Sequence, residues 1–146
     1  MKKILAFLLI TLVILAACGK SSSVRTPSPR CAPASSRQMD HIRSGVQGVQ
    51  TSNDVRQGMA VRSNDFKKVY FVAAKIYGPG IEDGEGPGVW FITGDPTSPG
   101  MIMSVNSYAK LFSDYPDANT TKTGALSNLQ ATMSNDGAME ARNCAE

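Results

Sequence analysis

Six successive apolar residues, Val69 to Ala74, constrain the fold of this chain more than any other feature of its sequence. A β-strand that is apolar on both faces is covered on both sides, which is typical of a central position in a sheet. Residues 57–62 also have the composition of a strand, and Ser-Asn-Asp at 63–65 has that of a tight turn. The pattern predicts a hairpin whose second strand, within residues 66–77, lies inside the sheet.

A second hairpin is predicted further along the chain. Residues 88–93 and 101–105 have the composition of strands, and the Gly, Asp and Pro residues between them at 94–100 favour a turn. The order hairpin, loop, hairpin predicts an antiparallel sheet of about four strands.

A helix is predicted before these strands. Ser35 or Ser36 is a candidate N-cap, although Gly45 and Gly48 weaken the helix that follows. Its apolar positions recur at helical spacing and are Met39, Ile42, Val46 and Val49.

Three short helices are predicted after the strands. They cover residues 106–115, with Asn106 as the cap and an end before Pro116, then residues 123–133, and then residues 136–145. We therefore expect a single α+β domain over residues 39–146, with short helices packed on the antiparallel sheet.

The first residues have the order of a secretory signal. Met1-Lys2-Lys3 precedes twelve apolar or hydroxyl residues, Ile4 to Leu15, and small residues follow. A helix that crosses a membrane needs about 20 apolar residues, so this run is too short to be a permanent anchor. Residues 1–17 are predicted to be a signal peptide.

The residues at the end of this run, Leu15-Ala16-Ala17-Cys18, resemble the lipobox of bacterial lipoproteins. The resemblance implies that a signal peptidase recognises Leu15, Ala16 and Ala17 and cleaves before Cys18. It also implies that Cys18 carries a diacylglycerol and an acyl chain such as palmitate, which hold the exported protein on the cell membrane or the outer membrane. The alternative is an ordinary signal cleaved after Ala17, which leaves Cys18 a simple thiol.

The charge of the chain is unevenly distributed. Residues 19–38 are rich in Ser and Pro and hold four basic residues and no acid, whereas residues 39–146 hold nine Lys or Arg against twelve Asp or Glu. We expect residues 18–38 to form a lipidated, flexible tether that either rests on anionic headgroups or serves as a soluble spacer. The acidic balance of an exported domain excludes a nucleic-acid partner.

The other two of the three cysteines, Cys31 and Cys144, lie near the ends of the mature chain. In an oxidising compartment they are expected to form one disulfide, which would contribute about 4–5 kcal/mol by chain entropy. A redox pair is the alternative, but such pairs usually have C-x-x-C spacing, which is absent. A zinc site is less favoured still, because His41 is the only histidine and the obvious donors do not make up four ligands; no metal or cofactor is expected.

Catalytic motifs are missing from the sequence, so we do not expect an enzyme. His41 is the only imidazole and no G-x-S-x-G motif occurs. The loop at 78–88, with five glycines and three acids, is either a weak calcium site or a solvated hairpin loop. Asp114 and Asp117 are the pair to inspect for glycoside cleavage, with turn chemistry as the alternative.

Four aromatic residues on the predicted strands are expected in the core rather than in a ligand platform. They are Tyr70, Phe71, Trp90 and Phe91.

Residues 63–80, 88–93 and 104–116 are similar to small secreted or lipid-anchored bacterial proteins that have no assigned activity. This resemblance transfers no functional residue, but it implies that residues 55–115 fold as one unit. The sequence favours a membrane-anchored envelope lipoprotein whose domain, without enzymatic activity, binds another envelope protein or a small ligand. The alternatives are a hydrolase of cell-wall or carbohydrate substrates and a surface lipoprotein that blocks a receptor, as in phage exclusion.

Overall fold

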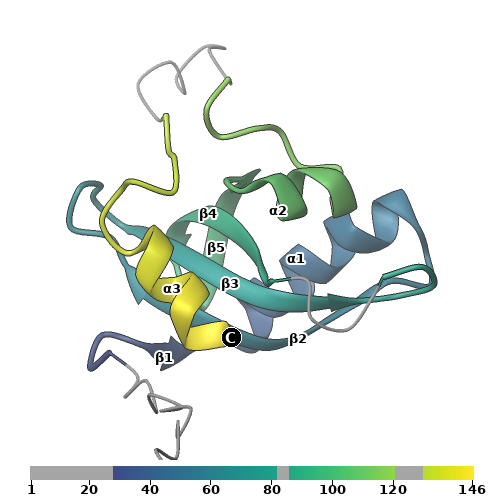
Figure 1. Ribbon diagram of the computed structural model, residues 1–146. Coiled ribbons are helices and arrows are strands. Elements are labelled where there is room, and N and C mark those ends of the chain that lie inside the picture. Colours follow the sequence, from purple (N-terminus) through teal and green to yellow (C-terminus); the bar gives the residue numbers. More distant parts are fainter. Residues whose placement is uncertain (1–27, 82–85, 121–129) are drawn as a thin grey trace, which may run out of the picture.

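The computed structural model describes residues 28–81, 86–120 and 130–146 as an α+β fold (Figure 1). The predicted signal peptide, with Leu15, Ala16 and Ala17, lies outside the described residues, and so does Cys18. The strands form one antiparallel sheet in the order β1-β2-β3-β4-β5. They are β1 (Ala32–Pro33), β2 (Asp54–Arg62), β3 (Val69–Tyr77), β4 (Gly88–Asp95) and β5 (Ser98–Ser104).

The α+β class is confirmed, but the sheet has five strands rather than about four. The additional strand is β1, in which Ala32 pairs with Ala60 and Pro33 pairs with Met59. A two-residue strand has no periodicity that the sequence could display, so it was not expected. Together with the first turn of the following helix, β1 lies in the stretch predicted to be tether.

The central position predicted for Val69 to Ala74 is confirmed, because β3 lies in the middle of the sheet. Its side chains alternate between two separate apolar cores. Phe71 and Ala73 belong to the core on one face, and Val72 and Ala74 belong to the core on the other. All four are fully buried.

A β-bulge in β2 changes which face its side chains occupy. The register shifts by one residue between Arg56 and Met59, and Gln57 has a φ of 55°. As a result Val55 lies on the same face as Ala60, although simple alternation would place them on opposite faces.

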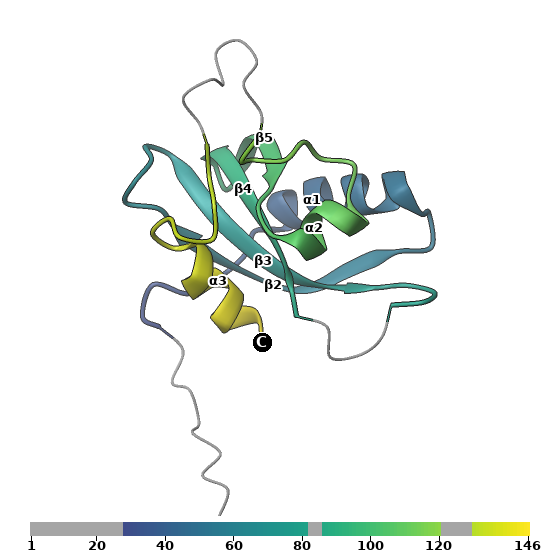
Figure 2. The same cartoon turned by 45° about the horizontal axis from the view of Figure 1, so that its top comes forward.

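One face of the sheet is covered by α1 (Ser36–Val49) and α2 (Ser107–Phe112) (Figures 1 and 2). Ser35 is the N-cap of α1 and forms a capping box with Gln38, and the predicted cap Asn106 accepts the Ala109 N–H at the start of α2. Ile42 is fully buried in the core beneath α1.

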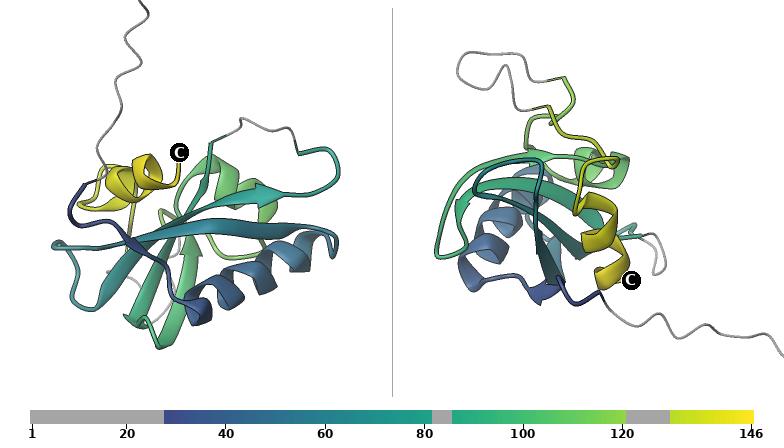
Figure 3. Two further views of the ribbon diagram at one scale, coloured as in Figure 1. Left: turned by 90° about the horizontal axis from the view of Figure 1, so that it is seen from below. Right: turned by 90° about the vertical axis from the view of Figure 1, so that its left-hand side faces the viewer.

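The opposite face is covered by α3 (Ala138–Ala145), which Figure 3 shows on the other side of the sheet from α1. This helix confirms the one predicted over residues 136–145. The helix predicted over 123–133 lies mostly outside the described residues, and its described part, 130–133, is not helical. Within the described ranges, no helix is long and apolar enough to cross a membrane.

Candidate interaction site at the joined chain ends

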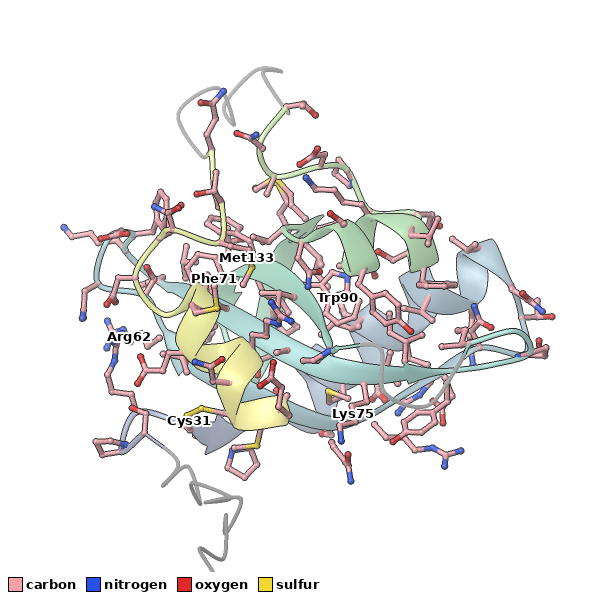
Figure 4. All side chains as sticks on the ribbon, in the orientation of Figure 1. Cys31, Arg62, Phe71, Lys75, Trp90 and Met133 are labelled. Atoms are coloured by element: carbon pink, nitrogen blue, oxygen red, sulfur yellow. A yellow bond between two sulfur atoms is a disulfide. The ribbon has the colours of Figure 1, made fainter. Side chains whose placement is uncertain are left out.

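The predicted disulfide is confirmed: Cys31 and Cys144 are bonded across a sequence separation of 113 residues. Cys31 comes directly before β1, and Cys144 lies in the last turn of α3 (Figure 4). The bond therefore joins the two ends of the folded domain. We call residues 28–33 and 136–146, with this disulfide, the terminal clasp.

Ion pairs reinforce the terminal clasp. The Arg30 guanidinium donates to both carboxylate oxygens of Asp136, at 2.9 and 2.6 Å, and lies 3.0 Å from Glu140. Glu140 also accepts a hydrogen bond from the Ser28 hydroxyl. The hydrogen bonds from Arg30 and from the Asn64 N–H lower the pKa of Asp136 from 3.8 to about 2, and the bond to Asp136 raises the pKa of Arg30.

The turn between β2 and β3 is tied to the same network. The Asn64 N–H donates to Asp136 at 2.9 Å, and the Asp136 N–H donates to Asp65 at 2.8 Å. The Ser63 hydroxyl donates to the Asp136 carbonyl at 3.1 Å. Three segments that are distant in the sequence, the start of the described chain, this turn and the start of α3, are therefore held together by hydrogen bonds.

The first residues of α3 approach the sheet closely. Gly137 has a φ of 90°, and a Cβ there would lie 3.1 Å from Val61 and 3.4 Å from Phe71. Glycine alone meets both demands, because it tolerates this backbone conformation and leaves room for the core. The buried side chains of α3 itself are the methyl groups of Ala138, Ala141 and Ala145.

A buried hydroxyl network on the other face was not predicted. The Trp90 indole N–H donates to the Ser113 Oγ at 3.2 Å, and the Ser113 hydroxyl donates to the Ala109 carbonyl at 2.6 Å. The Ser104 and Ser113 hydroxyls are 2.9 Å apart. This network connects α2 to the sheet and satisfies the polar atom of the largest buried side chain. Serines in a strand end and a helix end have no sequence signal for such a role.

The structure describes the surroundings of the three residues considered for catalysis. His41 is exposed, and its carbonyl accepts the Tyr115 hydroxyl. Asp114 lies against α1 beside Gly48. Burial raises the pKa of Asp117, but hydrogen bonds from Lys110 and from the Asn119 N–H outweigh it, and the net pKa is lowered.

Phe71, Trp90 and Phe91 are fully buried and Tyr70 is partly buried, as expected for core aromatics. Phe91 contacts both Phe66 and Phe71 edge to face. No group of three or more His, Cys, Asp or Glu able to hold a metal occurs in the part of the chain that the structure describes. The predicted loop at 78–88 contains residues 82–85, which lie outside that part, so its calcium interpretation is untested.

No protein-family model, curated protein or solved structure matches this chain. Its own geometry is therefore the only guide to a functional site. Among the described residues, the terminal clasp is the place where covalent, ionic and hydrogen-bonded contacts converge, and it stands where the chain from Cys18 enters the domain.

Proposed function

We propose that this protein is a cell-envelope lipoprotein, held on the bilayer by an acylated Cys18, whose domain binds a partner and has no enzymatic activity. The observation that carries the proposal is the Leu15–Cys18 motif at the end of the apolar run. The disulfide supports it, because pairing of Cys31 with Cys144 leaves Cys18 as the cysteine to carry lipid. A disulfide between distant cysteines is also typical of exported proteins.

The contacts of Asp114 and Asp117 support the proposal of a binding domain. A glycosidase needs two facing carboxyl groups, one of which has a raised pKa and acts as the general acid. The pKa of Asp117 is lowered instead, and this residue bonds Lys110. The bonds of Asp117 and the contact of Asp114 with α1 are what we expect if this pair stabilises a turn, the alternative that the sequence left open.

The anchor is tested by intact mass and membrane fractionation of the wild type beside Cys18→Ala. We expect the wild type to sediment with membranes and to carry acyl mass, and the variant to lose both properties. Without reductant the wild type should be two hydrogens lighter than with it, owing to the Cys31–Cys144 bond. A wild type released after Ala17 with no added mass would overturn the lipoprotein assignment.

The absence of enzymatic activity is tested separately. Purified protein is incubated with isolated cell wall, and the release of reducing sugar ends is measured against a sample without protein. We expect no release above that background. Release by the wild type that Asp114→Asn or Asp117→Asn abolishes would establish the hydrolase alternative.

A further inference from the structure

The position of α3 on its face of the sheet depends on contacts outside the apolar core. The helix has eight residues and buries three alanines, whereas its large apolar residue, Met139, is 46% exposed. A helix this short is not stable by itself, and the buried side chains that it contributes are only three methyl groups. The retention of α3 therefore depends on the terminal clasp as well as on its apolar contact with the sheet.

Among these ties, the disulfide is the dominant one. The side chains of Arg30, Asp136 and Glu140 are 36%, 34% and 22% exposed. Ion pairs at such solvent contact contribute little and are screened by salt. The Cys31–Cys144 bond is covalent and holds the last turn of α3 beside β1.

The rest of the domain is stabilised by strand pairing and core packing that do not involve α3. β3 is paired on both sides by β2 and β4, and the core beneath α1 contains Ile42, Val46 and Trp90, each 0% exposed. None of these contacts passes through α3. Loss of α3 from the sheet would leave the other face closed and would uncover part of the core that contains Phe71 and Phe91, against which Phe66 also packs.

We propose that the Cys31–Cys144 bond is a redox-operated latch: its reduction by a dithiol releases α3 from the sheet, uncovers the apolar face around Phe71 and Phe91, and leaves the remainder folded. Both cysteines are partly exposed rather than buried. The latch does not depend on acylation of Cys18.

The exchange reaction is balanced by the dithiol. One thiolate of the dithiol attacks one sulfur of the Cys31–Cys144 bond, forms a mixed disulfide and expels the other cysteine as a thiolate, which takes up a proton. The second thiol of the dithiol loses its proton and attacks the mixed disulfide. The dithiol leaves as a cyclic disulfide, and two electrons and two protons have passed to Cys31 and Cys144.

The test is hydrogen–deuterium exchange of the folded full chain before and after treatment with dithiothreitol, followed by mass spectrometry of peptides from α3 and α1. Because local opening exposes only the amides of the segment that opens, we expect exchange in α3 to rise about tenfold or more, with less than about twofold change in α1. Binding of a hydrophobic fluorescent dye should rise in parallel. The reductant is added only after the protein has folded, so the test does not require the reduced chain to fold.

Two variants sharpen this test. Cys31→Ser with Cys144→Ser should show the rapid exchange of α3 without reductant, and Arg30→Gln, which keeps the disulfide, should remain close to the oxidised wild type. Equal acceleration in α1 and α3 would show global unfolding and overturn the latch. Unchanged exchange in α3 after complete reduction, checked by thiol titration, would overturn it as well.

Discussion

The two faces of the sheet are covered in different ways. On one face, the fourteen-residue α1 places the large side chains of Ile42 and Val46 against a core that contains Trp90. On the other, the eight-residue α3 places alanine methyl groups in the core that contains Phe71 and Phe91 and is bonded at its end to Cys31. The difference teaches that a long amphipathic helix is retained by its own apolar surface, whereas a short, small-residue helix needs covalent help.

The largest effect is expected from Trp90→Ala on the α1 face. Trp90 is fully buried, and its truncation creates a cavity and removes the hydrogen bond from its indole N–H to the Ser113 hydroxyl. We expect a loss of about 3–5 kcal/mol in the free energy of unfolding, measured by urea titration with far-UV circular dichroism. Trp90→Phe, which fills most of the cavity, should lose clearly less.

Ile42→Ala compares the two covering helices directly. This residue of α1 is fully buried, so its truncation should cost about 2–5 kcal/mol in the same urea titration. The matched change in α3 is Met139→Ala, which should stay within about 0.5 kcal/mol of the wild type because the side chain is exposed. Equal losses in the two variants would contradict the difference between the helices.

Gly45→Ala tests how closely Tyr115 packs against α1 at Gly45. A Cβ on Gly45 would overlap the ring of Tyr115, whose burial also raises its pKa. Overpacking costs about 1–3 kcal/mol, which outweighs the gain of about 1 kcal/mol in helix propensity. Thermal unfolding should therefore show a net loss.

Gly48→Ala is the matched control for this prediction. A Cβ there would meet the carboxylate of Asp114, which lies at the end of an exposed side chain and can move aside. Its melting temperature should equal or exceed that of the wild type. A destabilised Gly48→Ala beside an unaffected Gly45→Ala would refute the role given to the Tyr115 ring.

Asp136→Asn tests the ionic part of the terminal clasp and has the smallest expected effect. Because folding lowers the pKa of Asp136 from 3.8 to about 2, its ionised form stabilises the fold above about pH 4, and this contribution is lost as the pH falls toward 2. Urea midpoints measured from pH 5 to pH 2 should therefore fall less steeply in Asp136→Asn than in the wild type. Asp95→Asn, which removes an exposed carboxylate outside the network, is the control and should retain the wild-type slope.

Much of the fold could be predicted from local sequence. The apolar run Val69 to Ala74 gave the central strand, and the caps Ser35 and Asn106 marked two helix starts. These features depend on neighbouring residues alone, which is why they are visible in a sequence.

The burial of individual residues was harder to predict than the elements that contain them. Val49 was expected on the buried side of α1, but it is half exposed because the helix ends there and the chain turns away. Gln38 is buried instead, since its side chain folds back to accept the Ser35 N–H. The bulge in β2 likewise hid the inward position of Val55 from any rule based on simple alternation.

The candidate site likewise contains one feature that could be predicted from the sequence and one that could not. The pairing of Cys31 with Cys144 could be predicted because two cysteines remained after Cys18 was assigned to lipid. The convergence of Arg30, Asp136 and Glu140 could not, since an ion pair between residues 106 positions apart leaves no local pattern.

The disulfide also changes what a protease can do to this protein. Because the bond joins Cys31 to Cys144, the polypeptide between them is a closed loop. A single peptide-bond cleavage anywhere within that loop opens the ring but leaves both fragments covalently connected. If Cys18 is acylated as proposed, one such cut cannot shed either fragment from the cell, and release requires a second cut or a reductant.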